Sequence, residues 1–441
     1  MPSINITETQ LGTANDLSPL SNAVFIVGFT SKSDAPKVPT KCETKEQFKK
    51  LFGETAAAFG VDQPYPTYTE SSTNGFTANA IPSGNSPKMF KSGDSDPSYD
   101  IAISLLTLGL TVIYQCVLDN SKNVVTTPTV ASLYSFVKSN TFEDTVLGDV
   151  GQYNVAYLTL GGYPSFEYTY SDGTVLADKM IACAQHRGDC VALIDATNNT
   201  QRAIGTNDAT SVFKSAQSVT QDDTKILGSY GALFYPYVNN EAPSFAYLKC
   251  VANAAQNADG VSALAIAGVN RAVVSGAKAE NIVPTIPNSV ADAYSTKEPG
   301  EIAINGITNI VPYGPTVWGN RTLLKNKTTS SNGEYRQALS FLNVRVMVNN
   351  IKKYIRSVAQ SLTFEPNNDI LWVNFKAGIS TYLDQLITGY GLSKYTIEKQ
   401  DTKGKLATVK AKIKLYVIEA VEDWELELQV IDSAVTEVEG E

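Results

Sequence analysis

The sequence contains few of the side chains on which enzyme active sites depend. Among 441 residues there is one histidine, His186, and a single imidazole cannot provide both a metal site and a catalytic base. The Gly-x-Ser-x-Gly elbow, the phosphate loop ending in Gly-Lys-Ser/Thr and the His-Glu-x-x-His pair are also missing. These absences argue against elbow hydrolases, nucleoside triphosphatases and zinc proteases. We expect no catalytic residue, no bound metal and no cofactor.

Long apolar runs are missing as well. No stretch reaches the roughly 18 apolar residues that span a bilayer. The opening residues, MPSINITETQLG, have neither the basic nor the apolar region of a secretory signal peptide. We therefore expect no signal peptide and no direct insertion into a membrane.

Cysteine is scarce, and its five positions are scattered and odd in number (Cys42, Cys116, Cys183, Cys190, Cys250). This pattern favours reduced, buried thiols in a protein made in a cytosol over a disulfide framework. A metal site at Cys183, His186 and Cys190 is the alternative. Its spacing is loose, and the sequence offers no second Cys/His pair to complete it.

The charge and composition indicate an acidic globular protein. Hydrophobic residues make up 43 %, charged residues 18 %, and the formal net charge is −9. A phosphate backbone demands a basic face, so the balance gives no support for nucleic acid as a partner. A chain of 441 residues is longer than a single hydrophobic core usually supports, so the length predicts two or three domains.

Other conspicuous residues are interpreted structurally, although Asp195 also has a functional interpretation. Asp195 ends the apolar run VALID, where α/β enzymes often place function, but an Asp there also caps the next turn. Glu422 and Asp423 are adjacent, so on a strand they point to opposite faces and do not form an acid/base pair. The three tryptophans are flanked by apolar residues and are interpreted as packing anchors (Trp318, Trp372, Trp424).

Strand-like and helical stretches alternate through the first 260 residues. Strands are predicted at 23–29, 111–117, 153–160, 190–194 and 226–237, and helices at 44–52, 101–108, 176–185 and 244–257. Residues 61–100 are rich in Ser, Thr, Asn, Pro and Gly and are interpreted as a long surface excursion. The alternation favours an α/β domain with a largely parallel sheet.

The last hundred residues follow a different pattern. A helix is predicted at 335–342, and the next has one apolar stripe made of Val348, Ile351, Ile355, Val358 and Leu362. Asp369 is expected to cap a further helix, 370–386, and strands are predicted at 409–420 and 423–430. In "EDWELELQV", Trp424, Leu426, Leu428 and Val430 share one face of such a strand. A strand near a terminus exposes unpaired main-chain groups that another chain can satisfy.

Several of these stretches closely resemble the tail sheath proteins of contractile phage tails and related contractile injection systems. The segments are "VPYGPTVWGNRTL" (311–323), "FLNVRVMVNNIKKYIRSVAQSLTFEPNNDILWVNF" (341–375) and "IKLYVIEAVEDWELELQV" (413–430). "NAVFIVGFTSKSDAPKVPTKCETKEQFKKLFG" (22–53) and "ISLLTLGLTVIYQCV" (103–117) are similar to the opening of the family. The resemblance is weakest at 61–100 and 200–260. It departs at 262–282, where Ala267-Gly268-Val269 remains but the family's tryptophan is absent.

The resemblance implies a fold and a division of the chain. The fold is an α/β central domain with a subtilisin-like parallel sheet, joined to an α+β carboxyl-terminal domain whose sheet is completed by strands from neighbouring subunits. The implied divisions are a linking arm at 1–20, a strand, helix and surface excursion at 21–100, and the non-catalytic central domain at 101–325. The carboxyl-terminal sheath domain follows at 326–424, and a second linking arm at 425–441.

The resemblance also implies a structural function and its partners. Such subunits form a homo-oligomer, a helical stack of hexameric rings around an inner tail tube protein, with baseplate and tail terminator proteins at the ends. The sleeve contracts and drives the tube through a cell envelope. The implied location is a virion tail or tail-like particle assembled in a bacterial cytoplasm. The implied intersubunit arm residues are Ile4, Ile6, Leu11, Leu426, Leu428, Val430, Val435 and Val438.

One surface is predicted from the residues themselves. Arg345, Lys352, Lys353 and Arg356 lie largely off the apolar stripe of their helix. They form either a solvated face or a docking face for an acidic tube, and weak exposed ion pairs suit a contact that must break during contraction. Two other functions stay open, a hydrolase built on the subtilisin-like core and another self-assembling baseplate or shell component.

Overall fold

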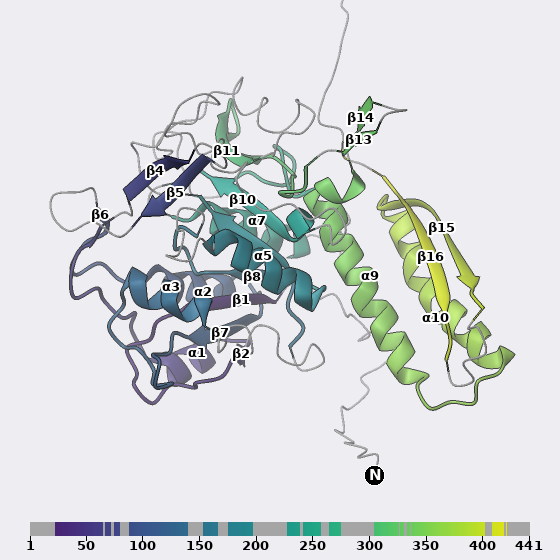
Figure 1. The fold of residues 1–441 in the computed structure, drawn as a ribbon, viewed down its shortest axis with the longest axis horizontal. Coiled ribbons are helices and arrows are strands. Elements are labelled where there is room, and N and C mark those ends of the chain that lie inside the picture. Colours follow the sequence, from purple (N-terminus) through teal and green to yellow (C-terminus); the bar gives the residue numbers. More distant parts are fainter. Residues whose placement is uncertain are drawn as a thin grey trace, which may run out of the picture.

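The computed structural model describes residues 23–64, 67–71, 75–79, 88–139, 153–165, 175–196, 227–238, 241–256, 264–274, 304–325, 327–329, 333–335, 337–401, 408–418 and 420. An eight-stranded sheet forms the centre of the described chain (Figure 1). Its strand order is β12-β11-β10-β9-β8-β1-β7-β2. The prediction of a mixed α/β fold with a largely parallel sheet is confirmed.

The six inner strands of this sheet are parallel, and the strand at each edge is antiparallel to its neighbour. The parallel strands are β1 (Val24–Gly28), β7 (Val112–Cys116), β8 (Tyr157–Thr159), β9 (Val191–Asp195), β10 (Gly231–Tyr235) and β11 (Asn305–Ile310). The edge strands are β2 (Thr40–Cys42) and β12 (Gly314–Trp318). Since β1 lies in the middle of the sheet, residues before position 100 and residues after it build one structure.

Helices cover both faces of the sheet, which explains why its central strands are apolar throughout. One face packs on α3 (Val130–Lys138) and α5 (Leu176–Arg187), through side chains such as Leu133 and Met180. The other face packs on α1 (Lys45–Phe52), α2 (Pro97–Thr107) and α7 (Pro243–Gln256), through side chains such as Phe48 and Leu105. All five residues of β1, β7, β9 and β10 are buried.

The helix termini follow local sequence signals. The Thr44 side chain accepts a hydrogen bond from the Gln47 amide and begins α1, and Gly53, with a φ of 104°, ends it. Helix α2 begins earlier than predicted, at Pro97, because the Asp96 side chain caps it and proline is favoured in a first turn.

The carboxyl ends of β1 and β8 mark the point where the strand order reverses, which is where open α/β sheets usually bind ligands. In this protein Asp96 fills that position. Its carboxylate accepts hydrogen bonds from the Phe29 amide (3.2 Å), the Tyr163 hydroxyl (2.7 Å) and the Ser98 hydroxyl, and burial raises its pKa to about 6. The site of ligand binding in related architectures is therefore occupied by the start of α2.

Short hairpins lie outside the main sheet. β3 (Gln63–Pro64) pairs with β6 (Lys88–Phe90), β4 (Thr67–Ser71) with β5 (Gly75–Asn79), and β13 (Lys327–Thr329) with β14 (Gly333–Tyr335). The predicted surface excursion at 61–100 thus contains strands. One end of it is tied to the core, because Phe90 stacks on Phe59 with ring centroids 4.8 Å apart.

Two predictions about the carboxyl-terminal helices are wrong. Residues 335–342 do not form a helix, because the main chain of this segment bonds to residues 320–322 and leaves one short turn, η3 (Ala338–Ser340). The cap of the last helix, α10 (Asp369–Thr388), is Asn368, whose side chain accepts from the Leu371 amide, and Asp369 is the first helical residue. The strand predicted at 226–237 is confined to β10, after the 3-10 turn η1 (Leu227–Tyr230).

The close approach of α2 to the sheet gives a first testable prediction. A Cβ atom at Gly28 would overlap the Ser98 and Tyr114 hydroxyls, whereas a Cβ at Gly60 would have only an ordinary contact with Thr127. We expect Gly28→Ala to lower the free energy of unfolding by about 1–3 kcal/mol because the site has no spare volume, and Gly60→Ala to change it by less than about 0.5 kcal/mol. Urea unfolding of both variants measures this, and equal effects would contradict it.

Candidate functional site

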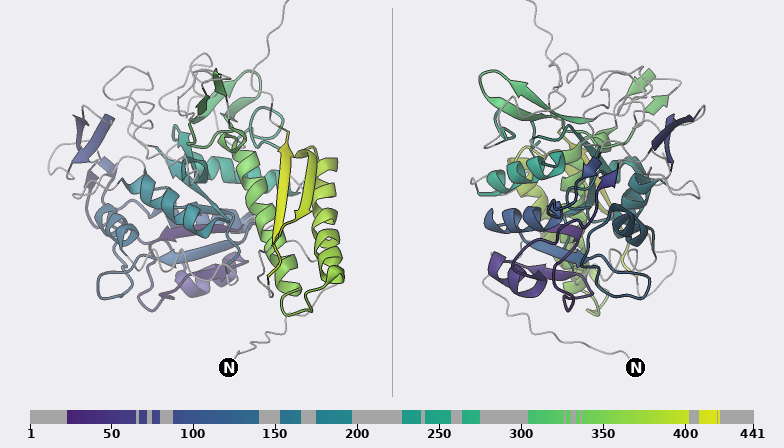
Figure 2. Two further views of the ribbon diagram at one scale, coloured as in Figure 1. Left: turned by 45° about the vertical axis from the view of Figure 1, so that its right-hand side comes forward. Right: turned by 90° about the vertical axis from the view of Figure 1, so that its left-hand side faces the viewer.

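The carboxyl-terminal part of the described chain forms a unit of two helices and a hairpin, here called the terminal unit. It consists of α9 (Leu342–Ser361), α10, β15 (Leu392–Lys399) and β16 (Ala411–Val417). Its own hydrophobic core contains Val344, Met347 and Ile351 of α9 and Leu383 and Leu386 of α10. Figures 1 and 2 show the hairpin lying along the two helices, beside the main sheet.

The hairpin has one face toward the helices and one toward solvent. Side chains of β16 alternate between half-buried and exposed along the strand. Ile413, Leu415 and Val417 pack toward the core of the terminal unit, while Lys412 and Lys414 are exposed. The predicted strand at 409–420 is confirmed in its centre, whereas β15 is not among the predicted strands.

Two strands cover the helices incompletely. The inward residues of β16 stay half-buried, and so do Val348, Ile355 and Val358 of α9. Among the described strands, β15 and β16 pair only with each other, so each has one edge without a β-ladder in that part of the chain. The hairpin can therefore accept additional strands at its edges.

The basic residues of α9 do not form the exposed face that the sequence predicted. Arg345 is 2 % exposed and Lys353 7 % exposed, so neither can contact an external tube in this structure. Arg345, Asn349, Lys352 and Lys353 recur at helical spacing and form a polar stripe that faces the central sheet. For Lys352, which bonds to the same chain but is exposed, and for Arg356, a role toward the tube stays a prediction.

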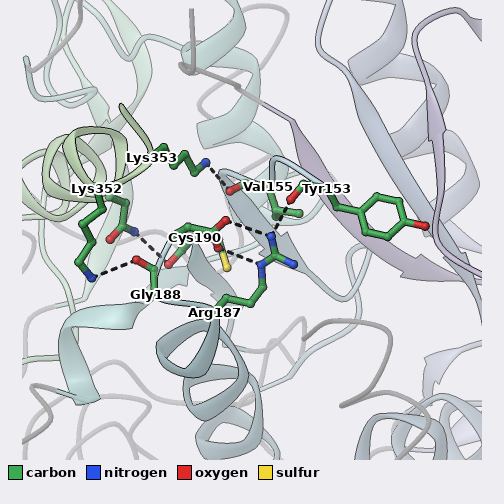
Figure 3. Close-up of polar contacts among 9 residues, drawn as sticks. Tyr153, Val155, Arg187, Gly188, Cys190, Lys352 and Lys353 are labelled. Carbon is green, nitrogen blue, oxygen red and sulfur yellow. Dashed lines mark hydrogen bonds and ion pairs between the residues drawn. The ribbon is translucent and has the colours of Figure 1, made fainter. Parts of the chain in front are cut away.

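The polar stripe binds main-chain oxygens at the amino ends of neighbouring strands (Figure 3). Lys353 Nζ donates to the Val155 carbonyl oxygen (2.6 Å), before β8, and Asn349 Nδ2 donates to the Cys190 carbonyl oxygen (3.0 Å), before β9. Lys352 Nζ donates to the Gly188 carbonyl oxygen (3.0 Å), at the end of α5. Helix α9 therefore lies at the amino ends of the sheet strands, whereas Asp96 and Asp195 lie at their carboxyl ends.

Arg187 and Asp189 stabilise the loop between α5 and β9, to which α9 binds. Their side chains form a bidentate ion pair, with Nε–Oδ1 at 2.9 Å and Nη2–Oδ2 at 3.0 Å, and Arg187 Nη2 also donates to the Tyr153 carbonyl oxygen (2.7 Å). Both side chains are almost completely buried. Burial lowers the pKa of Lys353 to about 8, and the nearby Asp189 carboxylate opposes that shift.

Arg345 lies at the same interface and stacks on an aromatic ring. Its guanidinium carbon is 4.1 Å from the ring centroid of Tyr230, and Nη2 donates to the Ser229 hydroxyl (2.5 Å). Burial lowers the pKa of this guanidinium, and its Nε has no hydrogen-bond partner among the described residues. The polar stripe thus attaches the terminal unit to the central sheet through hydrogen-bond donors of fixed direction. Burying these charged groups costs free energy of desolvation.

Asp195 and the five cysteines, which the sequence offered as candidates for enzyme chemistry, are buried. Asp195 is buried and accepts hydrogen bonds from the Ser244 amide (2.8 Å) and hydroxyl (2.7 Å) at the start of α7, so its side chain binds a helix far along the chain and not the next turn, which the capping interpretation predicted. All five cysteines are free and buried. Burial raises the pKa of the Cys190 thiol to about 12, so it is not a thiolate at neutral pH, while His186 is exposed.

The described residues contain neither a candidate metal cluster nor a candidate membrane-spanning helix. In this part of the chain no group of three or more His, Cys, Asp or Glu side chains is arranged to hold a metal ion. No described helix combines the length and apolar character needed to cross a membrane.

The predicted intersubunit arm residues lie outside the described residues. This applies to Ile4, Ile6 and Leu11 at the amino end and to Leu426, Leu428, Val430, Val435 and Val438 at the carboxyl end. Their strand exchange stays a prediction. The sequence located Arg345, Lys352 and Lys353 on one side of the α9 helix, but it missed Asn349 and the bonds of this stripe to the central sheet.

Adjacent lysines on α9 allow a matched test of the polar stripe. Lys353→Met leaves the Val155 carbonyl without its donor, and we expect a loss of about 1–3 kcal/mol in the free energy of unfolding. Lys352→Met changes an exposed side chain, and we expect a loss below about 1 kcal/mol. Chemical unfolding of both variants measures the difference, and the reverse order would contradict the assignment.

The lowered pKa of Lys353 adds a pH signature. Between pH 8 and the ordinary value of 10.5, the folded protein binds fewer protons at this group than the unfolded chain. Its contribution to stability therefore rises with pH across that window. Lys353→Met should remove this rise, measured as the difference in unfolding free energy between pH 7.5 and pH 10.

Comparisons with known proteins identify the architecture. No protein-family model and no curated protein matches the sequence. Among solved structures, the chain is similar to one in the contracted PVC sheath complex of an extracellular contractile injection system, with a TM-score of 0.59 and 17 % identity over 97 % of both chains. It is also similar to a chain in the anti-feeding prophage baseplate, with a TM-score of 0.56 and 15 % identity over 97 % of this chain and 98 % of that one. The protein has a contractile-sheath-like fold along nearly its whole length.

Proposed function

We propose that this protein is a structural sheath subunit that polymerises into a helical sleeve of hexameric rings around an inner tube. Contraction of the sleeve drives the tube through a target cell envelope. The observation that supports this most is the match to the PVC sheath complex over 97 % of both chains. The particle is a virion tail or a tail-like particle, and baseplate and terminator proteins border the sleeve.

The proposed division of labour follows the architecture. The parallel sheet with its helices is a rigid body, similar to the subtilisin fold but without catalysis, and the carboxyl-terminal sheath domain at 326–424, which contains the terminal unit, receives arms of neighbouring copies. Residues 1–20 of one copy and 425–441 of another add strands to the β15–β16 hairpin. Each main-chain hydrogen bond contributes about 0.5–1.5 kcal/mol, and burial of apolar side chains adds roughly 25 cal/mol per Å².

Contraction then requires no chemical step. Each arm links one subunit to the next by a heterologous contact, which propagates along a helix without closing. Two packings of the rigid bodies, one extended and one contracted, differ in the surface they bury. The arms keep the subunits connected while the bodies repack.

A second candidate function is a baseplate component, and the similarity to a chain of the anti-feeding prophage baseplate favours it specifically. A baseplate subunit forms a finite ring, whereas a sheath subunit forms open tubes. The hydrolase alternative has less support, since Asp195 is engaged by Ser244. A covalent serine probe that labels the purified protein would support the hydrolase.

Truncation tests the proposed function. Deleting residues 1–20 or residues 425–441 removes a proposed arm and leaves the described core intact. We expect both variants to keep the circular dichroism spectrum and thermal midpoint of the full chain within about 3 °C. In negative-stain micrographs the full chain should form hollow tubes and the variants should not. Tubes formed by both truncated proteins, or rings formed by the full chain, would count against a sheath.

A further inference from the structure

Helix α9 joins the rest of the terminal unit to the main sheet. Among the described residues, the hydrophobic core of the unit contains only residues of 338–417, and within it α10, β15 and β16 pack on α9 and on one another. In Figure 1, α9 lies between the main sheet and these three elements. The position of the hairpin relative to the sheet therefore follows from how α9 is held.

Two anchor points hold the first part of α9. At its start, Asn320 Nδ2 donates to Asn343 Oδ1 (2.7 Å), and Asn320 Oδ1 accepts from the Asn343 amide (3.1 Å). The second anchor point is formed by Asn349 and Lys353, which donate to the carbonyl oxygens before β9 and β8. The two anchor points are about 15 Å apart along the helix axis. Residues 354–361 of α9 continue beyond the second one.

This last part of α9 packs closely against α10. Tyr354 stacks on Tyr382 with ring centroids 4.5 Å apart, and a Cβ atom at Gly378 would lie 3.1 Å from Val358. Because the two helices have little freedom between them, α10 and the hairpin follow any tilt of α9. Over the roughly 30 Å length of such a helix, a tilt of about 10° moves the far end by about 5 Å. That displacement equals about one spacing between neighbouring strands.

The segments that accept the hydrogen bonds of the second anchor point are themselves tied together. Arg187 pairs with Asp189, before β9, and donates to the Tyr153 carbonyl oxygen, before β8. Apolar contact has no preferred direction, so an apolar side of α9 could shift on the sheet. Donors aimed at main-chain oxygens allow one arrangement instead, and burying polar groups at a cost in stability is best understood where they specify such an arrangement.

We propose that Asn349 and Lys353 are positioning residues, which fix the angle between the hairpin and the main sheet and thereby the helical twist of the polymer. The inference rests on the proposed function, and it adds which residues inside one subunit determine where the next subunit is placed. With apolar side chains of similar size at both positions the chain still folds, but the terminal unit takes a range of angles.

Spin labels test the positioning within a single chain. Labels at Lys50→Cys, on α1, and Lys376→Cys, on α10, are both exposed, and the five native cysteines are buried and do not compete for the reagent. Labelled protein is diluted into an excess of unlabelled chain, so that distances between copies do not contribute. Asn349→Leu with Lys353→Met should make the distance distribution about twice as broad, because a tilt of α9 moves α10 by several ångströms.

A control of a different kind separates position from stability. Leu383→Ala removes a buried side chain from the core of the terminal unit, away from the polar stripe. It should lower the thermal midpoint at least as much as the double variant does, yet leave the distance distribution unchanged. Asn349→Leu alone is the milder variant and should broaden the distribution to a smaller extent.

Electron cryo-microscopy of the tubes tests the second step. Tubes of the wild type, of Leu383→Ala and of Lys352→Met, which changes an exposed neighbour in the stripe, should share one helical twist. Tubes of the Asn349→Leu, Lys353→Met variant should differ from it by several degrees or have no uniform twist.

The outcomes distinguish this inference from the proposed function. A distance distribution that stays narrow in the double variant, or that broadens equally in Leu383→Ala, overturns the positioning role. A broadened distribution with an unchanged twist overturns its link to the polymer. A wild-type chain that never polymerises overturns the sheath function and the effect on twist, while the spin-label distances still decide whether Asn349 and Lys353 position the hairpin.

Discussion

A hairpin of two strands is too small to cover the apolar surface of two helices of 20 residues each, and the assembly of this protein depends on that incomplete cover. β15 and β16 bury the centre of the terminal unit, yet the inward residues of β16 and several of α9 stay half-exposed. The outer edge of each strand also forms no ladder within the described chain. Apolar surface and main-chain groups left in this state favour an added strand.

The rest of the structure is built so that this unit can be held firmly. The main sheet has helices on both faces. At the point where its strand order reverses, the buried Asp96 carboxylate accepts hydrogen bonds and occupies the space. At the amino ends of the strands, the polar stripe of α9 donates hydrogen bonds to the carbonyl oxygens that precede β8 and β9. A rigid attachment of this kind would transmit a pull on the hairpin to the central sheet without local unfolding.

The sequence predicted the elements whose signals are local. The apolar run at 23–29 predicted β1, and the helix predicted at 44–52 agrees with α1 to within one residue, while the terminal sheath-like segments indicated the fold class. Helix 335–342 was wrong because long-range bonds to residues 320–322 replace the helical ones. β11 and β12 were missed, since Asn305, Thr308 and Thr316 are buried polar residues that hide the strand pattern, and β15 was not predicted either.

The candidate site was predicted in part, for a physical reason. Hydrophobic periodicity located the apolar face of α9, but the sequence does not distinguish a buried lysine from an exposed one. Lys353 can be buried because the Val155 carbonyl oxygen accepts a hydrogen bond from its ammonium group and Asp189 lies nearby, and both partners are far away in sequence. Only the folded chain shows that the basic stripe is an internal attachment.

A cryo-electron microscopy map of the assembled polymer tests the central claim most directly. The account predicts that in every subunit the β15–β16 hairpin is extended by at least one strand from another copy, continuous with the hairpin in a single β-ladder. A map in which the hairpin stays two-stranded, with both terminal segments folded onto their own subunit, would contradict it.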